Sequence, residues 1–176
     1  MRESIKSDVM VAGSKPSRLT RYVVGVTKTD HTGITVQSID ESLHFWIDVL
    51  GFTLLGRDTF TGKFIAEMTG VPGTTFLQAL IGAPGHTIEL LQCVAPDDRQ
   101  IVKPRPVDVG SVHIAFFVND IDTLITHAAT VGWNALGPTQ IVDHGALEGT
   151  RLAYVRGPDG VLVEFLERPN VSASAS

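Results

Sequence analysis

The chain has 176 residues, of which 43% are hydrophobic and 19% are charged, and its formal net charge is −5. This length and composition are typical of a globular protein with its own hydrophobic core, and they exclude extensive disorder. The sequence contains no lysine and arginine cluster that would predict nucleic-acid binding, and no apolar run near the roughly 20 residues that cross a bilayer. The single Cys93 cannot form an internal disulfide, so we expect a cytoplasmic protein.

The sequence divides into two modules between two weakly patterned ends. Residues 1–29 mix charged residues with serine and glycine and are expected to form an N-terminal arm, and residues 169–176 are expected to form a tail. We assign residues 30–95 to a first module, residues 96–110 to a linker, and residues 111–168 to a second module. This division rests on an internal repeat.

The repeat is clearest where each module begins. His31-Thr-Gly-Ile-Thr-Val and His113-Ile-Ala-Phe-Phe-Val both start with histidine, run apolar and continue through a polar corner into Ile-Asp. His113 follows His31 by 82 residues, whereas Gly132 follows Gly51 by 81 residues. The second helix is therefore one residue shorter than the first.

A helical pattern follows each of these first strands. An apolar stripe over residues 39–50 predicts the first helix, with Ser38 as its N-cap and Gly51 at its end. A similar stripe predicts a second helix, with Asn119 as N-cap and Gly132 at its end.

Alternating and β-branched segments predict four strands in each module. In the first module they fall near residues 31–36, 52–60, 75–81 and 86–94, and in the second near residues 112–118, 133–142, 151–156 and 161–167. Residues 61–73 are expected to form a loop or a short helix. Each module then has the order strand, helix, strand, strand, strand.

Each module places a histidine at the start of its first strand and a glutamate inside its last strand. These residues are His31 and Glu89 in the first module, and His113 and Glu164 in the second. If each sheet curls into half a barrel and the halves face one another, the four side chains meet at one centre. Two imidazoles and two carboxylates suit Zn²⁺, Ni²⁺, Co²⁺, Mn²⁺ or Fe²⁺ without selecting among them. The pattern therefore predicts one divalent metal ion per site.

Each of the four residues also has a simpler explanation when it is considered alone. His31 fits an exposed strand end, His113 fits a core histidine, and either glutamate fits an outward-facing strand position. Repetition of the same His and Glu pair in both modules favours the metal site over four unrelated placements.

At these residues the sequence resembles the vicinal-oxygen-chelate superfamily, which includes glyoxalase I, methylmalonyl-CoA epimerase, extradiol dioxygenases, fosfomycin-resistance enzymes and bleomycin-binding proteins. The resemblance covers roughly residues 31–168 and rests on four segments: His31-Thr-Gly-Ile-Thr-Val, Ile88-Glu-Leu-Leu, Val112-His-Ile-Ala-Phe-Phe-Val-Asn-Asp-Ile-Asp and Arg156-Gly-Pro-Asp-Gly-Val-Leu-Val-Glu-Phe. It implies an α+β fold of two tandem βαβββ modules that form an open, curved mixed-sheet cup, often as a homodimer. The superfamily's four ligand positions fall on His31, Glu89, His113 and Glu164.

The resemblance also implies a reaction. A full set of four ligands is more similar to glyoxalase I and the epimerase, which implies proton transfer beside a metal-bound carbonyl of a small metabolite, or of a thioester such as a glutathione or coenzyme A adduct. Glu164 is the expected base and Glu89 is its alternative. A metal-dependent dioxygenase of an aromatic substrate and a non-catalytic drug-binding protein remain as alternative functions.

The contacts with substrate are less constrained by the sequence. Arg57 and Arg151 are candidates for binding an anionic group, Phe64 for an apolar wall, and His144 for a loop contact, although ordinary surface and core roles explain the same residues. The sequence also leaves open whether the four ligands come from one chain or from two chains of a dimer.

Overall fold

The structure is a computed structural model, which describes residues 25–169 of the chain. Most of the predicted arm and tail lie outside these described residues. The first module contains β1 (Thr32–Val36), α1 (Ile39–Leu43), the π-helix η1 (His44–Val49), β2 (Thr53–Phe60), α2 (Lys63–Thr69), β3 (Thr75–Ala83) and β4 (His86–Ala95). The second contains β5 (His113–Phe117), α3 (Ile121–Thr130), β6 (Asn134–Ala135), β7 (Gln140–Ile141), β8 (Arg151–Arg156) and β9 (Leu162–Glu167).

Each module forms its own mixed sheet. The strand orders are β1-β4-β3-β2 and β5-β9-β8-β6, and β7 also pairs with β8. The first strand of each module lies parallel to its last strand, whereas the other neighbours are antiparallel. The predicted α+β class and repeated module are therefore confirmed. The short α2 occupies part of the segment for which a loop or a short helix was expected.

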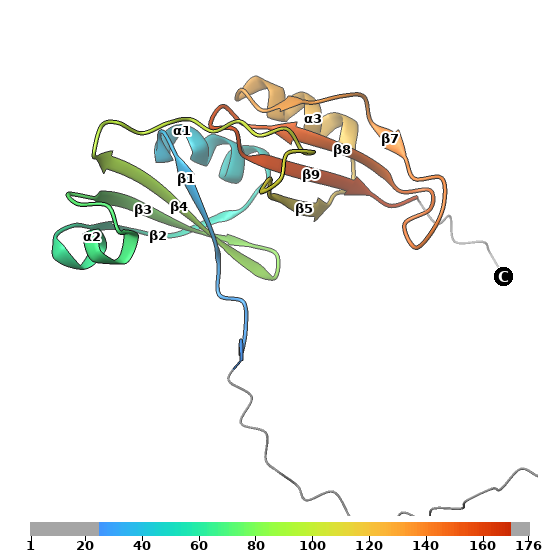
Figure 1. The fold of residues 1–176 in the computed structure, drawn as a ribbon. Coiled ribbons are helices and arrows are strands. Elements are labelled where there is room, and N and C mark those ends of the chain that lie inside the picture. Colours follow the sequence, from blue (N-terminus) through green and yellow to red (C-terminus); the bar gives the residue numbers. More distant parts are fainter. Residues whose placement is uncertain (1–24, 170–176) are drawn as a thin grey trace, which may run out of the picture.

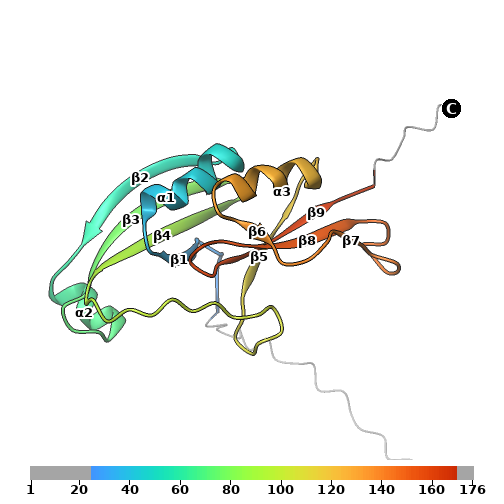
Figure 2. The ribbon, with the colours of Figure 1, turned by 90° about the horizontal axis from the view of Figure 1, so that it is seen from above.

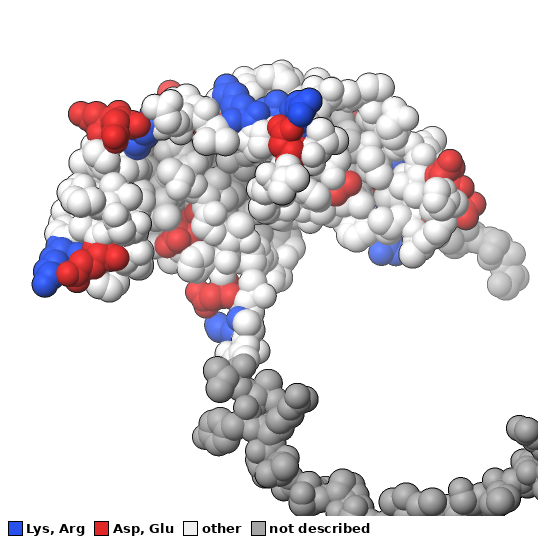
Figure 3. All heavy atoms as spheres, viewed as in Figure 1, with Lys and Arg blue, Asp and Glu red and all other residues white. Residues whose placement is uncertain are grey.

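The helices α1, η1 and α3 cover one side of the two sheets and lie next to each other there (Figures 1 and 2). Their buried aromatic residues join the modules, because the Phe45 ring of η1 stacks on Trp133 of the second module with 3.6 Å between centroids. Phe45 and Trp46 are fully buried, and Trp133 is nearly so. We call the opposite, uncovered side of each sheet the open face; the molecule is hollowed on that side (Figure 3).

The first helix differs from the prediction in its second half. Residues 44–49 form a π-helix, in which the Leu50 amide donates to the Phe45 carbonyl, five residues earlier. A π turn accommodates one residue more than an α turn does. The extra residue of the first module is therefore absorbed within this helix, and Gly51 still ends it with φ of 72°.

Two other predictions were wrong in detail. Asp120, and not Asn119, is the N-cap of α3, since its carboxylate accepts hydrogen bonds from the amide and the hydroxyl of Thr123. The strand predicted over residues 133–142 is broken into β6 and β7, because the segment between them contains Pro138, which has no amide hydrogen for a sheet. Within the described residues 25–169, no helix is long and apolar enough to span a membrane.

Replacing Gly157 should destabilise the protein, because a Cβ there would lie 2.7 Å from two atoms of the buried Trp133 ring. The Trp133 ring is held by its stack on Phe45 and cannot move away freely. We expect Gly157→Ala to lower the free energy of unfolding by about 1–3 kcal/mol, measured by urea denaturation. Gly137→Ala is the matched control, since its Cβ would meet no atom within 4 Å, and an equal loss in both variants would contradict this account.

Candidate metal centre

The parallel pairing of β1 with β4 brings His31 to Glu89. Gly33 lies opposite Glu89 in this register, and His31 precedes Gly33 by two residues, so all three are on the open face. His31 Nε2 lies 3.2 Å from Glu89 Oε2. A Cβ on Gly33 would lie 3.5 Å from the same Glu89 oxygen, so the small residue leaves this carboxylate accessible.

The second module repeats this arrangement. Ala115 lies opposite Glu164, and His113 precedes Ala115 by two residues. His113 Nε2 lies 3.3 Å from Glu164 Oε2. Both glutamates are largely buried and both histidines are more than a third exposed. The two modules thus hold an imidazole and a carboxylate in nearly the same geometry.

Either His and Glu pair could hold half of a metal site. Two donors that bind one ion at about 2.1 Å and at right angles lie about 3.0 Å apart, close to the two observed separations. His31 Nδ1 lies 3.0 Å from Asp30 Oδ2, and since an ionised carboxylate can only accept, Nδ1 carries the proton. In the neutral ring, Nε2 then carries a lone pair that faces the Glu89 carboxylate. Because Nε2 and the carboxylate oxygen are both hydrogen-bond acceptors, a proton or a metal ion must lie between them.

The pKa of His31 reflects these neighbours. The hydrogen bond to Asp30 raises the pKa of the imidazole above its ordinary value; partial burial opposes this, and the negative charge of Glu89 adds to it. The pKa of Asp30 is lowered in turn, chiefly by the hydrogen bond from His31 and then by Lys28. A metal ion at Nε2 would therefore compete with a proton, and the raised pKa makes this competition stronger than for an ordinary histidine.

The two pairs do not form one cluster within the chain. Among residues 25–169, no group of three or more His, Cys, Asp or Glu side chains is placed to hold a metal ion. The two histidine-led strands β1 and β5 are each the edge of a separate sheet. A groove of about 620 Å³ lies between β1 and β5, and the linker and the turn between β8 and β9 also line it. His113 is the only one of the four predicted ligands in its lining.

Two further polar residues, neither of them predicted from the sequence, adjoin the glutamates. Gln78 of β3 donates from its side-chain amide to Glu89 Oε1. Tyr154 of β8 lies opposite Glu164 in register, and its ring packs edge-on against His113 with 5.1 Å between centroids. Burial, followed by the negative charge of Glu164, raises the pKa of the Tyr154 hydroxyl. Both residues could have been predicted from the alternation of side chains along a strand. Gln78 lies two residues from the partner of Glu89, and Tyr154 is itself the partner of Glu164, so both share the open face with the glutamates.

Comparison with known proteins agrees with this architecture. The family model described as Glyoxalase/Bleomycin resistance protein/Dioxygenase superfamily matches residues 28–165. The chain belongs to this superfamily.

Relatives within the superfamily include enzymes of more than one kind. The chain is 28% identical over 157 residues to a 2-epi-5-epi-valiolone epimerase of an Actinomyces species, a match that covers 85% of this chain and 84% of that protein. It is 27% identical over 141 residues to a probable lactoylglutathione lyase of Synechocystis, covering 78% of this chain and 92% of the lyase.

Solved structures show the same fold. A glyoxalase family protein from Bacillus cereus superposes with a TM-score of 0.70 at 23% identity, covering 83% of this chain and 97% of that one. A fosfomycin resistance protein from Listeria monocytogenes, whose crystal structure contains Mn(II), superposes with a TM-score of 0.56 at 13% identity, covering 83% and 94%.

The two arginines predicted to contact substrate lie on the helix-covered side of the sheets. Arg57 pairs with Asp40 at 2.6 Å, and Arg151 pairs with Asp122 at 2.7 Å and Glu167 at 2.8 Å. These carboxylates tie each arginine to a helix near its N-terminal end or to the neighbouring strand. Both guanidinium groups therefore point away from the face that carries Glu89 and Glu164.

The other two predicted substrate contacts are exposed. Phe64 and Met68 lie one turn apart on α2, with 67% and 65% of their surface accessible, so this short helix presents an apolar face. His144 lies in the exposed loop after β7, next to Asp143, to which its Nδ1 is hydrogen-bonded. Neither Phe64 nor His144 contacts any of the four predicted metal ligands through a hydrogen bond or ion pair in the described chain.

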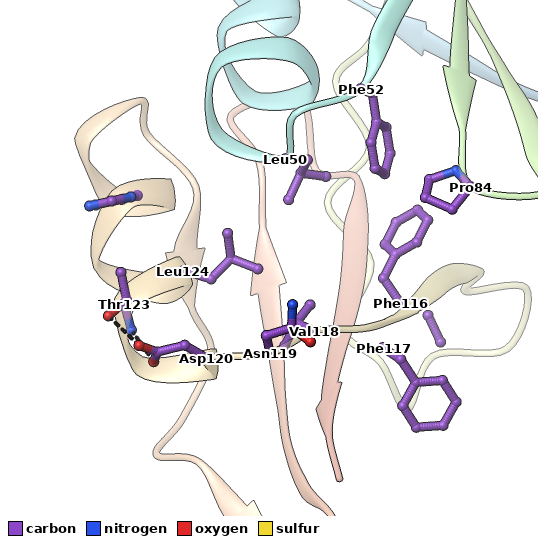
Figure 4. A pocket seen from close by; sticks show the side chains of 12 residues that line it. Leu50, Phe52, Pro84, Phe116, Phe117, Val118, Asn119, Asp120, Thr123 and Leu124 are labelled. Carbon is purple, nitrogen blue, oxygen red and sulfur yellow. Dashed lines mark hydrogen bonds between the residues drawn. The ribbon is translucent and has the colours of Figure 1, made fainter.

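A second pocket, of about 610 Å³, lies between the modules (Figure 4). Leu50, Phe52 and Pro84 of the first module face Phe116, Asn119 and Leu124 of the second, and the lining is mainly apolar. None of the four predicted ligands lines it. This pocket is therefore distinct from the His and Glu pairs.

Replacing Asp30 should lower the pKa of His31, because the amide of Asp30→Asn no longer favours the charged imidazole. The imidazolium of the native apoprotein should persist to higher pH than that of the variant, as measured by a ¹H–¹⁵N NMR titration of the ring nitrogens without metal. Lys28→Met is the control, since it retains the Asp30 carboxylate beside His31. An unchanged His31 titration in Asp30→Asn would show that this hydrogen bond does not form in solution.

Proposed function

We propose that this protein is a divalent-metal-dependent isomerase or lyase that transfers a proton at the carbon next to a carbonyl group of a small metabolite or thioester. The observation that carries this proposal is the repeated pair, in which His31 and His113 face Glu89 and Glu164 at 3.2 and 3.3 Å. A single His and Glu pair is common on protein surfaces. Two such pairs at corresponding positions of two modules support a shared function, which is to bind a metal ion.

His31, Glu89, His113 and Glu164 are the residues that would hold the ion. When bound, a divalent ion supplies Lewis acidity, which polarises the substrate carbonyl and stabilises negative charge that develops beside it. The donor set does not choose among Zn²⁺, Ni²⁺, Co²⁺, Mn²⁺ and Fe²⁺. The presence of Mn(II) in the related Listeria structure supports a divalent ion in this fold.

The side chains of the protein would then move the proton. Glu164 is the proposed base, which takes the proton from the carbon beside the carbonyl and returns it to the same or the neighbouring carbon. The Glu164 side chain is only 15% exposed, as is that of Glu89, so either proton acceptor is largely shielded from bulk water. Glu89 is the quasi-symmetric alternative.

A homodimer would complete the site. The two pairs of one chain belong to separate sheets with free edges at β1 and β5, and in one chain they form no cluster of three or more ligands within residues 25–169. A second copy that docks its β5 sheet beside β1 would bring His113 and Glu164 of one protomer to His31 and Glu89 of the other. Twofold symmetry would then create two equivalent sites.

The relatives bear on the class of reaction. Both an epimerase and a lactoylglutathione lyase match this chain along most of its length, and both names describe reactions of carbonyl compounds. We therefore propose 2-epi-5-epi-valiolone and glutathione or coenzyme A thioester adducts as the substrates to test. Oxygen consumption with an aromatic substrate would instead indicate a dioxygenase, and ligand binding without turnover would indicate a sequestering protein.

A mixing experiment should show where the site is formed. His31→Ala and His113→Ala should each lose metal affinity by at least about 100-fold, because loss of outer-shell partners alone costs about 10- to 100-fold. If the site is shared between protomers, dissociating and reassociating the two variants together should restore about a quarter of the wild-type metal sites, since half of the dimers are mixed and each mixed dimer has one intact site. The measurement is metal content after dialysis, with each variant reassociated alone as the control. No restoration would place the site within one chain, and no metal in the wild type would refute the proposed function.

Replacement of the proposed base should separate chemistry from folding. Glu164→Gln should reduce proton exchange between a carbonyl substrate and D₂O by about 10²- to 10⁴-fold, because an amide cannot accept the proton. The midpoint of urea unfolding of the apoprotein should stay close to that of the wild type, since the amide keeps the shape of the carboxyl group. Exchange at the wild-type rate in Glu164→Gln would transfer the role of base to another residue.

A further inference from the structure

The two carboxylates of the proposed site have unlike surroundings although their strands correspond. In the first module, Leu80 lies opposite Glu89 and Gln78 lies opposite Leu91. In the second module, Tyr154 lies opposite Glu164 and Leu152 lies opposite Leu166. Gln78 therefore corresponds to Leu152, so a hydrogen-bond donor in one half is replaced by an apolar side chain in the other.

This difference changes how firmly each carboxylate is held. The Gln78 amide donates to Glu89 Oε1, while Glu89 Oε2 faces His31 Nε2. An ionised carboxylate only accepts hydrogen bonds, so the amide nitrogen, and not its oxygen, must point to Glu89. One oxygen of Glu89 is thus fixed by the protein, and the other is directed at the position that a metal ion would take.

Glu164 has no equivalent restraint. Its Oε2 faces His113, and its other neighbour on the open face is the Tyr154 ring, which is packed against that same histidine. No side chain among residues 25–169 donates a hydrogen bond to Glu164 other than through the His113 pair. Leu152, at the position of Gln78, has no donor to offer.

We propose that Gln78 is the positioning residue that fixes the Glu89 carboxylate where it would hold a metal ion, and so leaves the unrestrained Glu164 as the carboxylate that would act on substrate. This inference rests on the proposed function, and it explains why two quasi-symmetric glutamates have different roles. A Glu89 side chain fixed by Gln78 would contribute to holding the ion, whereas Glu164 would remain free to reorient.

The test is the metal affinity of the full chain, measured on apoprotein by competition for Mn²⁺ and Zn²⁺ with a chromophoric chelator. Gln78→Met keeps the length of the side chain and removes the donor, so affinity should fall by about 10- to 100-fold, as expected for loss of an outer-shell partner. Leu152→Met is the matched control at the corresponding position of the second module, and its affinity should equal that of the wild type. The urea unfolding midpoints of the Gln78→Met and Leu152→Met apoproteins should equal each other, because a role of Gln78 limited to structure would change stability and not metal affinity.

The outcomes separate this inference from the proposed function. A Gln78→Met affinity within about twofold of the wild type would overturn the role of Gln78 and leave the metal site intact. An equal fall in Gln78→Met and Leu152→Met would also overturn it, since the effect would then not depend on the hydrogen bond. A wild-type chain that binds neither ion would overturn both the inference and the proposed function.

Discussion

The parallel pairing of the first strand of each module with its last strand is the constraint on which the candidate site depends. In β1 and β4, and again in β5 and β9, the register sets a histidine two residues before the position that faces a glutamate. Because alternate residues share a face, this offset alone directs the imidazole and the carboxylate to the same side. The helix-covered core on the other side of each sheet holds the register, since a slip by one residue would expose Ile88 or Val163 and bury the glutamate.

The repeat in the sequence predicted this part of the structure well. The order of elements, the Ser38 cap, the final glycines of both helices and the two His and Glu pairs all follow from local patterns that act within one module. The arrangement of one module against the other depends instead on side chains that meet over a long sequence distance, above all Phe45 and Trp133. Trp133 had been assigned to a strand, because an aromatic residue before an alternating segment satisfies a strand pattern equally well.

The orientation of Arg57 illustrates a different limit. The pairing of β2 with β3 contains a bulge between Leu54 and Gly56, where two steps along one strand match a single step along the other. A regular register would have set Arg57 opposite Gln78 on the open face, whereas the bulge sets it opposite Ala79, where it reaches Asp40. A bulge moves every later residue of its strand to the opposite face of the sheet. The local sequence around Leu54 and Gly56 contains no pattern that predicts this bulge.

The π-helix η1 allows the first helix to contain one residue more than its counterpart without changing the position of the strand that follows. An additional residue in a regular α-helix would rotate all that follows by about 100° and would misalign the apolar stripe with the sheet. Here the wide turn takes up the surplus before Gly51, and the strand that follows starts in step with its counterpart in the other module. The extra residue in this turn therefore distinguishes one half of the molecule from the other without displacing either His and Glu pair.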